Sequence, residues 1–233
     1  MIIVVTGASK GIGKAVVERY AVEGHTVFIC ARNPEQLQAM ANEITAKHPQ
    51  SIIHTMAVDM SDKQQVIAFG NYILATAGSV DVLVNNAGSF LPGNTYIEED
   101  GVLEKMINTN LYSAYHLTRV LLPTMMAAKN GHIFNMCSIA SLQAYANGGS
   151  YSISKFALAG FSKNLREELK PHNIKVTAVY PGAVYTNSWS GSGVDPNRIM
   201  QSVDVAELIY TASKLSPQAC VEEIVLRPQL GDL

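Results

Sequence analysis

The chain has 233 residues, of which 48% are hydrophobic and 15% are charged, and its formal net charge is -2. This length and apolar content suit a single domain with a large core and argue against disorder. A nearly neutral chain has no electrostatic reason to bind nucleic acid, and its apolar runs are too short and too interrupted to span a bilayer. We therefore expect neither nucleic acid nor a membrane among its partners.

Short apolar runs rich in β-branched residues alternate with segments of helical periodicity along the chain. Strands are expected near residues 2–6, 25–31, 51–58, 81–86, 131–137, 173–180 and 220–226. Helices are expected near residues 11–23, 34–48, 62–78, 98–110, 111–129, 150–170 and 204–214. Apolar strands that alternate with helices predict an α/β fold, in which one doubly wound parallel sheet of seven strands carries helices on both faces. We expect residues 1–233 to form one such domain.

One long irregular stretch follows the sixth expected strand. It runs from Pro181 to about Val203, and it contains several glycines with Trp189 near its middle. Loops of this length in compact domains are usually functional lids or are disordered. We expect a short flap at about residues 183–203.

The first strand leads directly into a glycine-rich turn. Residues 1–5 are apolar, Gly7, Gly11 and Gly13 follow, and apolar residues then recur at helical spacing. Strand, glycine turn and helix are the context that a dinucleotide-binding loop requires, because the glycines allow close backbone approach and the helix N-terminus attracts pyrophosphate. The spacing is GxxxGxG rather than GxGxxG, and it does not match a P-loop. We expect this turn to bind phosphate.

Tyr151 and Lys155 stand four residues apart in an expected helix, and Ser138 lies 13 residues before the tyrosine. Residues at i and i+4 share one helix face. A free tyrosine titrates near pH ~10, and a fixed cation lowers that pKa toward the range useful for acid–base catalysis. We therefore expect Lys155 to lower the pKa of Tyr151. The alternative is a surface Tyr and Lys, because this spacing also occurs by chance.

The chain resembles the short-chain dehydrogenase/reductases over residues 1 to about 227. The resemblance rests on motifs in the family's order and at its intervals: residues 6–13, Asn85-Asn86-Ala87-Gly88, Asn110, Ser138, Tyr151 with Lys155, and Pro181-Gly182. It implies a Rossmann domain, an NAD(P) cofactor and hydride transfer between nicotinamide and a carbonyl or alcohol carbon.

The resemblance also implies roles for four catalytic residues. Tyr151 would donate a proton to the carbonyl oxygen, and Lys155 would lower the pKa of Tyr151 and hold the ribose of the nicotinamide. Ser138 would orient the substrate oxygen. Asn110 matches the position that holds a water on the Lys155 side, although an exposed polar residue within a helix is the alternative.

The end of the second expected strand bears on the choice of cofactor. An acidic residue at this position binds the ribose 2′-hydroxyl of NAD, whereas an Arg nearby accommodates the 2′-phosphate of NADP. The strand ends in Ala31-Arg32 with no acid before Glu35, and Lys10 lies inside the glycine turn. Arg32 and Lys10 match positions that contact the 2′-phosphate in NADP-preferring relatives. We expect NADP(H) rather than NAD(H), with two surface cations as the alternative.

The resemblance extends the cofactor site to other segments. Asp59, with Met60 beside it, would bind the adenine amino group, although Asp59 could instead cap the next helix with Ser61 or Asp62. Thr186 would bind the carboxamide or cap the flap. The full expected set is Gly7, Ser9, Lys10, Gly11, Ile12, Gly13, Arg32, Asp59, Met60, Asn86, Ala87, Gly88, Tyr151, Lys155, Pro181, Gly182, Val184 and Thr186.

Three segments supply candidates for the substrate pocket. The candidate residues in these segments are Phe90, Gln143, Tyr145, Tyr185 and Trp189. Their aromatic rings would stack on a flat substrate or only pack the flap. We expect an NADPH-dependent reductase of a small carbonyl compound. The ending of the chain is closer to sepiapterin reductase-like members than to 3-ketoacyl-carrier-protein reductases, which stay an alternative, as does a regulatory or scaffold protein that binds NADP(H).

The remaining polar residues suggest no other chemistry. Cys30, Cys137 and Cys220 are isolated in apolar runs that are expected to be buried strands, and no Cys or His spacing indicates a metal site. The six histidines are scattered, and most are expected at the surface or at strand edges. The first strand begins at once, without a signal peptide, so we expect a cytoplasmic protein. The resemblance implies a homodimer or homotetramer formed through helices 111–129 and 150–170.

Overall fold

A computed structural model describes residues 1–186, 189, 191 and 193–232. The strands are β1 Ile2–Thr6, β2 Thr26–Ala31, β3 Ile52–Ala57, β4 Val82–Asn85, β5 Gly131–Met136, β6 Ile174–Pro181, β7 Val184–Tyr185, β8 Met200–Gln201 and β9 Glu223–Leu226. The α-helices are α1 Gly11–Val22, α2 Pro34–Lys47, α3 Lys63–Ala77, α4 Val102–Ile107, α5 Ser113–Ala128, α6 Gly149–Leu169 and α7 Ser202–Ser213. A π-helix, η1, spans Asn108–Tyr112, and 3-10 turns span Ile139–Ser141, Lys170–His172 and Pro196–Arg198.

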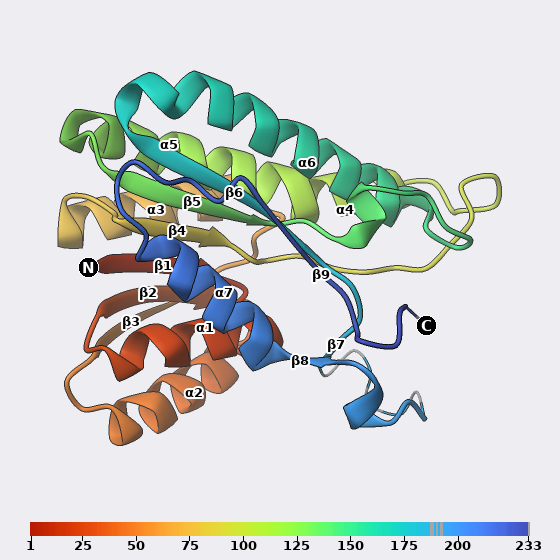
Figure 1. The fold of residues 1–233 in the computed structure, drawn as a ribbon, viewed down its shortest axis with the longest axis horizontal. Coiled ribbons are helices and arrows are strands. Elements are labelled where there is room, and N and C mark those ends of the chain that lie inside the picture. The colour runs from red at the N-terminus through yellow and green to blue at the C-terminus, as the bar shows by residue number, and fades with distance from the viewer. Residues whose placement is uncertain (187–188, 190, 192, 233) are drawn as a thin grey trace.

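Seven parallel strands form the main sheet in the order β3-β2-β1-β4-β5-β6-β9. Helices α1, α2 and α7 cover one face, and α3, α5 and α6 cover the other (Figure 1). The predicted α/β class and doubly wound sheet are confirmed. The strand order reverses between β1 and β4, and ligands of such sheets bind in the crevice outside the carboxyl ends of the strands at this point.

Successive side chains of β1 lie in two hydrophobic cores, one on each face of the sheet. Ile3 and Val5 belong to the cluster under α1, α2 and α7, whereas Val4 belongs to the cluster under α3, α5 and α6. All three side chains are fully buried. Because side chains alternate between the two faces of a strand, a strand buried on both faces is apolar at every position. This explains the continuous apolar runs in the sequence.

The helical segment before β5 differs from the prediction. Helix α4 begins at Val102 rather than near residue 98, after Gly101, whose φ of 89° is left-handed. The expected break between residues 110 and 111 is absent, because α4 continues through η1 into α5. A π-turn accommodates one extra residue without ending the helix, and such turns are frequent at functional sites.

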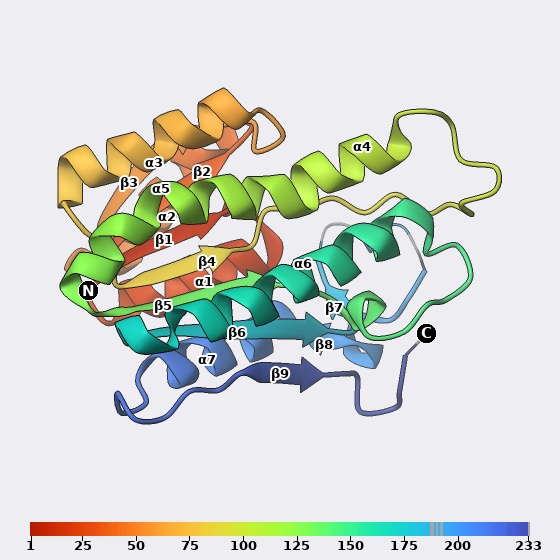
Figure 2. The ribbon, with the colours of Figure 1, turned by 90° about the horizontal axis from the view of Figure 1, so that it is seen from above.

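The region expected to be one irregular flap contains regular structure. Within it β7 pairs in parallel with β8, and residues 196–198 form a 3-10 turn. Arg198 donates hydrogen bonds to the backbone carbonyls of Leu230 and Gly231, so the last described turn of the chain lies against this segment (Figure 2). Part of the expected flap, residues 187–188, 190 and 192, lies outside the described residues.

The outer surface of α6 is apolar in its N-terminal half. Ile153 and Phe156 are 43% and 45% exposed, so the described part of the chain covers them only partly. Within the described part of the chain, no helix has the length and apolar character needed to cross a membrane.

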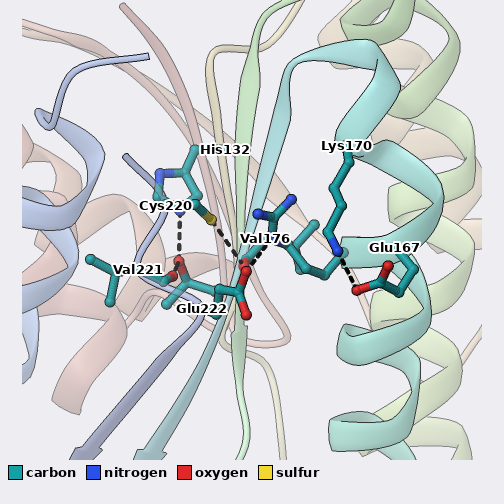
Figure 3. Close-up of polar contacts among 9 residues, drawn as sticks. His132, Glu167, Lys170, Val176, Cys220, Val221 and Glu222 are labelled. Atoms are coloured by element: carbon teal, nitrogen blue, oxygen red, sulfur yellow. Dashed lines mark hydrogen bonds and ion pairs between the residues drawn. The ribbon is translucent and has the colours of Figure 1, made fainter. Parts of the chain in front are cut away.

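His132 is an exception to the expectation that most histidines lie at the surface or at strand edges. It is buried at the start of β5, which lies in the interior of the sheet. The hydroxyl of Thr177 donates to the carbonyl of Val221, so its oxygen accepts a hydrogen bond from His132 Nε2 at 2.7 Å (Figure 3). Cys220 also differs from the prediction, because it precedes β9 and is only partly buried.

Burial lowers the pKa of His132 from 6.5 to about 3, and Lys175 acts in the same direction. At mildly acidic pH the His132 side chain is therefore protonated in the unfolded chain and neutral in the folded chain. Stability from this residue is fully present above about pH 6.5 and is lost progressively toward pH 3; the loss is about 2 kcal/mol by about pH 5.

Urea unfolding at several pH values tests this expectation. His132→Gln, which cannot titrate, should have a shallower decline of the free energy of unfolding between pH 6.5 and pH 5. His172→Gln, at a partly exposed position, serves as the control and should keep the wild-type slope. An unchanged slope in His132→Gln would contradict the assignment.

Candidate active site

The four candidate catalytic residues come from separate elements and meet at the carboxyl ends of the strands. Ser138 follows β5, Tyr151 and Lys155 lie in the first two turns of α6, and Asn110 lies in η1. The glycine turn after β1 ends at the same edge. Residues that were 150 positions apart in the chain are thus gathered at one end of the sheet.

Asn110 is buried, with 1% of its surface exposed, and all of its polar atoms are engaged. Its Oδ1 accepts a hydrogen bond from Ser89 N at 2.8 Å, and its Nδ2 donates to Ser89 O at 3.0 Å and to Ser154 Oγ at 2.9 Å. Ser154 in turn donates to the carbonyl of Tyr151. Asn110 therefore ties the segment after β4 to the helix that carries Tyr151, and it is not an exposed polar position.

Lys155 is also buried, with its Nζ donating to the carbonyl of Met136 at 2.6 Å. Burial lowers the pKa of this ammonium to about 8. Gly88 lies directly beside it, because a Cβ at Gly88 would be 3.5 Å from Lys155 Nζ and 3.1 Å from Asn110 Oδ1. A side chain at position 88 would therefore be in contact with both Asn110 and the ammonium.

The environment of Tyr151 corrects the expected direction of its pKa. Burial raises the pKa of the phenol, and a hydrogen bond with Ser138 only partly opposes this. Lys155 Nζ lies 5.8 Å from the Tyr151 ring centroid and is bonded to Met136 O instead. Tyr151 is therefore uncharged at neutral pH, which is the state that an acid requires.

Ser138 begins the 3-10 turn that follows β5. Its Oγ accepts a hydrogen bond from Ala140 N at 3.2 Å, which leaves the hydroxyl proton to be donated elsewhere. The side chain is 9% exposed.

The glycine turn has the geometry of a phosphate-binding loop. Gly7 and Gly11 have φ values of 64° and 57°, which favour glycine. A Cβ at Gly13 would be 2.5 Å from Gly7 O, so only glycine allows α1 to pack this closely on the turn. Helix α1 begins at Gly11 without a side-chain cap or an acid in its first turn, and its free N–H groups favour an anion. Ser9, Lys10 and Ile12 complete the turn.

The segment after β4 holds the glycine turn in place. Asn86 Nδ2 donates to the carbonyls of Thr6 and Gly7 at 2.8 and 3.0 Å. Thr6 Oγ1 accepts hydrogen bonds from the backbone of Asn86 and Ala87 at 3.0 and 2.9 Å. The Asn-Ala-Gly motif therefore holds the glycine turn in place through these hydrogen bonds. Thr6 is a partner that the sequence did not reveal.

Arg32 follows β2 at the same edge as the glycine turn, and both Arg32 and Lys10 are exposed. Within the described part of the chain, neither side chain forms a hydrogen bond or an ion pair with another side chain. Both cations are therefore available to an anionic ligand.

Asp59 does not cap α3, because Asp62 accepts the hydrogen bonds from Gln64 and Gln65 at that helix N-terminus. Asp59 Oδ1 instead accepts from the backbone and hydroxyl of Ser61 at 2.9 and 2.7 Å. Met60 is buried beside it. The capping alternative for Asp59 is thus excluded, and its second oxygen faces no partner in the described residues.

The segment after β6 reaches back to the glycine turn. A Cβ at Gly11 would be 3.1 Å from Thr186 Cγ2, so these residues are neighbours. Val184 is buried in β7, and Pro181 ends β6. This part of the expected cofactor set therefore lies at the same edge of the sheet as the rest.

One of the substrate candidates lies beside Tyr151. The Phe90 ring meets the Tyr151 ring edge to face at 4.9 Å and 85°. Burial raises the pKa of Tyr145. Tyr145 also lines a cavity of about 650 Å³ between residues 94–96 and the start of α6. Tyr185 lies in β7, and Trp189 N donates to Thr186 O.

Gln143 is exposed in the turn between Ser138 and Tyr151. Sequence analysis did not single out Ser154, whose bridge between η1 and α6 is described above. The only possible signal was its place between Tyr151 and Lys155, because a serine there faces the same neighbours as the tyrosine one turn earlier.

A glycine turn after the first strand of a doubly wound sheet defines the Rossmann class of nucleotide-binding folds. Within this class the chain belongs to the short-chain dehydrogenase/reductase family, since the family pattern described as short chain dehydrogenase matches residues 1–195. The predicted family is confirmed, and the protein is an NAD(P)-binding oxidoreductase.

Similar proteins carry several activities. Sepiapterin reductase of Chlorobaculum tepidum is 32% identical over 100% of this chain and 98% of its own. A metagenomic short-chain oxidoreductase, solved in complex with NADP, is 33% identical with a TM-score of 0.85, over 98% of this chain and 97% of that one. L-sorbose reductase of Gluconobacter frateurii, solved with NADPH and L-sorbose, is 26% identical with a TM-score of 0.89, over 97% and 94%.

Proposed function

We propose that the protein is an NADPH-dependent reductase that converts a small carbonyl compound to an alcohol, with Tyr151 as general acid. The observation that carries this proposal is the cluster of Asn110, Ser138, Tyr151 and Lys155 at the sheet edge where the glycine turn ends, in which all but Tyr151 are buried. An uncharged phenol next to an ammonium with a lowered pKa suits proton donation to a carbonyl oxygen.

The cofactor would be held by groups that fit it. The cradle at Gly7 and Gly13, which a Cβ would fill, admits a pyrophosphate against the N-terminus of α1. NADPH, when bound, supplies a hydride to the carbonyl carbon. Lys155, whose Nζ lies beside Gly88, would hold the nicotinamide ribose.

Residues of the chain supply the proton that the substrate oxygen gains. Ser138 donates a hydrogen bond from its hydroxyl to the substrate oxygen and orients it, while its proton stays on the serine. As the carbonyl carbon gains the hydride, the phenol of Tyr151 transfers its proton to the oxygen, so the product is a neutral alcohol. Lys155 returns a proton to the phenolate along the side that Asn110 occupies, and the net consumption is one proton from solvent.

The cofactor preference rests on charge at the end of β2. Arg32 follows β2 and Lys10 lies in the glycine turn, and the end of β2 carries no acid before Glu35 to bind a free 2′-hydroxyl. A guanidinium binds phosphate through two parallel hydrogen bonds and can stack on adenine. NADPH is therefore the preferred cofactor in this proposal.

The substrate is proposed to be a small, flat carbonyl compound. Phe90 packs its ring edge to face with Tyr151, and Tyr145 lines the cavity at the start of α6. Aromatic rings pack well on flat, uncharged molecules. The Chlorobaculum relative is named a sepiapterin reductase, so the search for the substrate begins with sepiapterin.

A carbonyl panel with purified protein tests this proposal. NADPH consumption should be measured with sepiapterin, a diketone, an aromatic aldehyde and an acetoacetyl thioester, with NADH in parallel. We expect turnover of a flat carbonyl compound with NADPH. Turnover confined to the thioester would instead indicate a ketoacyl reductase, and tight NADPH binding without any turnover would indicate a regulatory protein.

A further inference from the structure

The segment after β4 folds back onto the turn that precedes α6. Gly93 N donates to Asn147 O at 3.1 Å, and Asn147 N donates to Asn94 Oδ1 at 3.2 Å. The two segments lie at the same end of the molecule (Figure 2). This contact joins residues more than 50 positions apart directly beside Tyr151.

Glu98 places its carboxylate at the N-terminus of α6. Its Oε1 accepts a hydrogen bond from Ser150 N at 3.0 Å, and its Oε2 accepts one from the Ser150 hydroxyl. Ser150 is buried, with 2% of its surface exposed, and Tyr151 is the next residue. Both oxygens of one carboxylate therefore bind the residue that precedes the phenol.

Helix α6 has no cap of its own. The residue before it is Gly148, which has no side chain, and the first turn contains no acid. The first N–H groups of a helix lack partners within the helix, and negative charge stabilises that end. Glu98 supplies the acceptor and the charge from a distant segment.

The surrounding backbone is shaped to admit this carboxylate. A Cβ at Gly93 would be 2.9 Å from Glu98 Oε1. Gly149 has a φ of 37°, and a Cβ there would overlap both Glu98 Oε1 and Gly93 O. Larger side chains at positions 93 and 149 would displace the Glu98 carboxylate. The bonds between Glu98 and Ser150 therefore depend on both glycines.

We propose that Glu98 is a positioning residue that caps α6 and thereby fixes Tyr151 against Ser138. Glu98 lies in the same segment after β4 as Phe90, whose ring contacts Tyr151, so the bond to Ser150 ties this segment to the helix that carries the acid. This inference rests on the proposed role of Tyr151. It assigns to Glu98 no contact with substrate or cofactor.

Three variants test the inference. In Glu98→Ala we expect kcat to fall about 10- to 100-fold, because small displacements of a reacting group cost rate steeply, while the Kd for NADPH stays within about twofold. Glu98→Gln can still accept from Ser150 N and can donate to the hydroxyl, so it should recover most of kcat. Glu99→Gln, at the exposed neighbouring acid, is the matched control and should behave as wild type.

Two further readouts separate positioning from a loss of folding. The pKa of Tyr151 in the pH profile of kcat should fall in Glu98→Ala, because burial raises it in the intact site and a loosened helix end admits water. Hydrogen exchange should quicken at amides 149–153 and stay unchanged in the sheet. A kcat and pH profile equal to wild type in Glu98→Ala would overturn the inference.

The hydrogen-exchange result is independent of the reaction. If wild-type protein reduces no carbonyl compound, the proposed function fails, yet exchange still reports whether Glu98 caps α6. If wild type is active and exchange at amides 149–153 is the same in Glu98→Ala, the capping itself is refuted.

Discussion

Tyr151→Phe is expected to bind NADPH as wild type does and to lose about 10²- to 10⁴-fold in kcat, the range that a positioned acid contributes. Phenylalanine keeps the ring that meets Phe90 edge to face, so the pocket should retain its shape. Only the proton donor is removed. Steady-state rates with the best substrate of the carbonyl panel give kcat, and NADPH fluorescence titration gives Kd.

A matched control removes a hydroxyl from the opposite face of the sheet. Tyr210 lies on α7, where its ring stacks against Arg19. Tyr210→Phe should keep wild-type kcat. If Tyr151→Phe also kept it, Tyr151 could not be the acid, and the proton would have to come from another group.

Arg32→Asp is expected to reverse the cofactor preference. The substitution removes the guanidinium proposed to bind the 2′-phosphate and places a carboxylate at the end of β2, where it can accept from a ribose hydroxyl. Losing one charged hydrogen-bond pair lowers kcat/KM with NADPH about 10- to 100-fold, and kcat/KM with NADH should stay level or rise. The ratio of the two constants is the measurement.

Lys10→Gln should change that ratio in the same direction by a smaller factor, because an ammonium binds phosphate as a point charge rather than through two parallel bonds. Lys129→Gln, at the C-terminal end of α5, is the control and should leave the ratio unchanged. A wild-type protein that prefers NADH would refute the proposed role of Arg32 and Lys10 together.

Features that depend on local backbone rules were predictable from the sequence. The GxxxGxG spacing predicted the turn at Gly7 and Gly11, because positive φ and close packing are properties of glycine itself. Seven strands followed from continuous apolar runs, since a strand between two helical layers has no polar face. Helix ends were less accurate, as at Val102, because a start before a π-helix has no strong capping signal.

Features that depend on long-range contacts were not predictable. The pKa of Tyr151 rises because the folded chain buries the phenol and engages Lys155 with Met136, and neither fact is contained in the four-residue spacing. His132 is buried because β5 lies inside the sheet. Glu98 meets Ser150 only because two loops 50 residues apart meet at one end of the molecule.

The bonds between Asn86 and the glycine turn have a thermodynamic consequence. The loop's shape is set by contacts within the protein, from Asn86 Nδ2 to two carbonyls and from two backbone amides to Thr6 Oγ1. A loop that is already ordered loses little conformational entropy when a nucleotide binds. Association should therefore resemble the docking of two rigid surfaces, with the affinity determined by phosphate contacts rather than reduced by the folding of the loop.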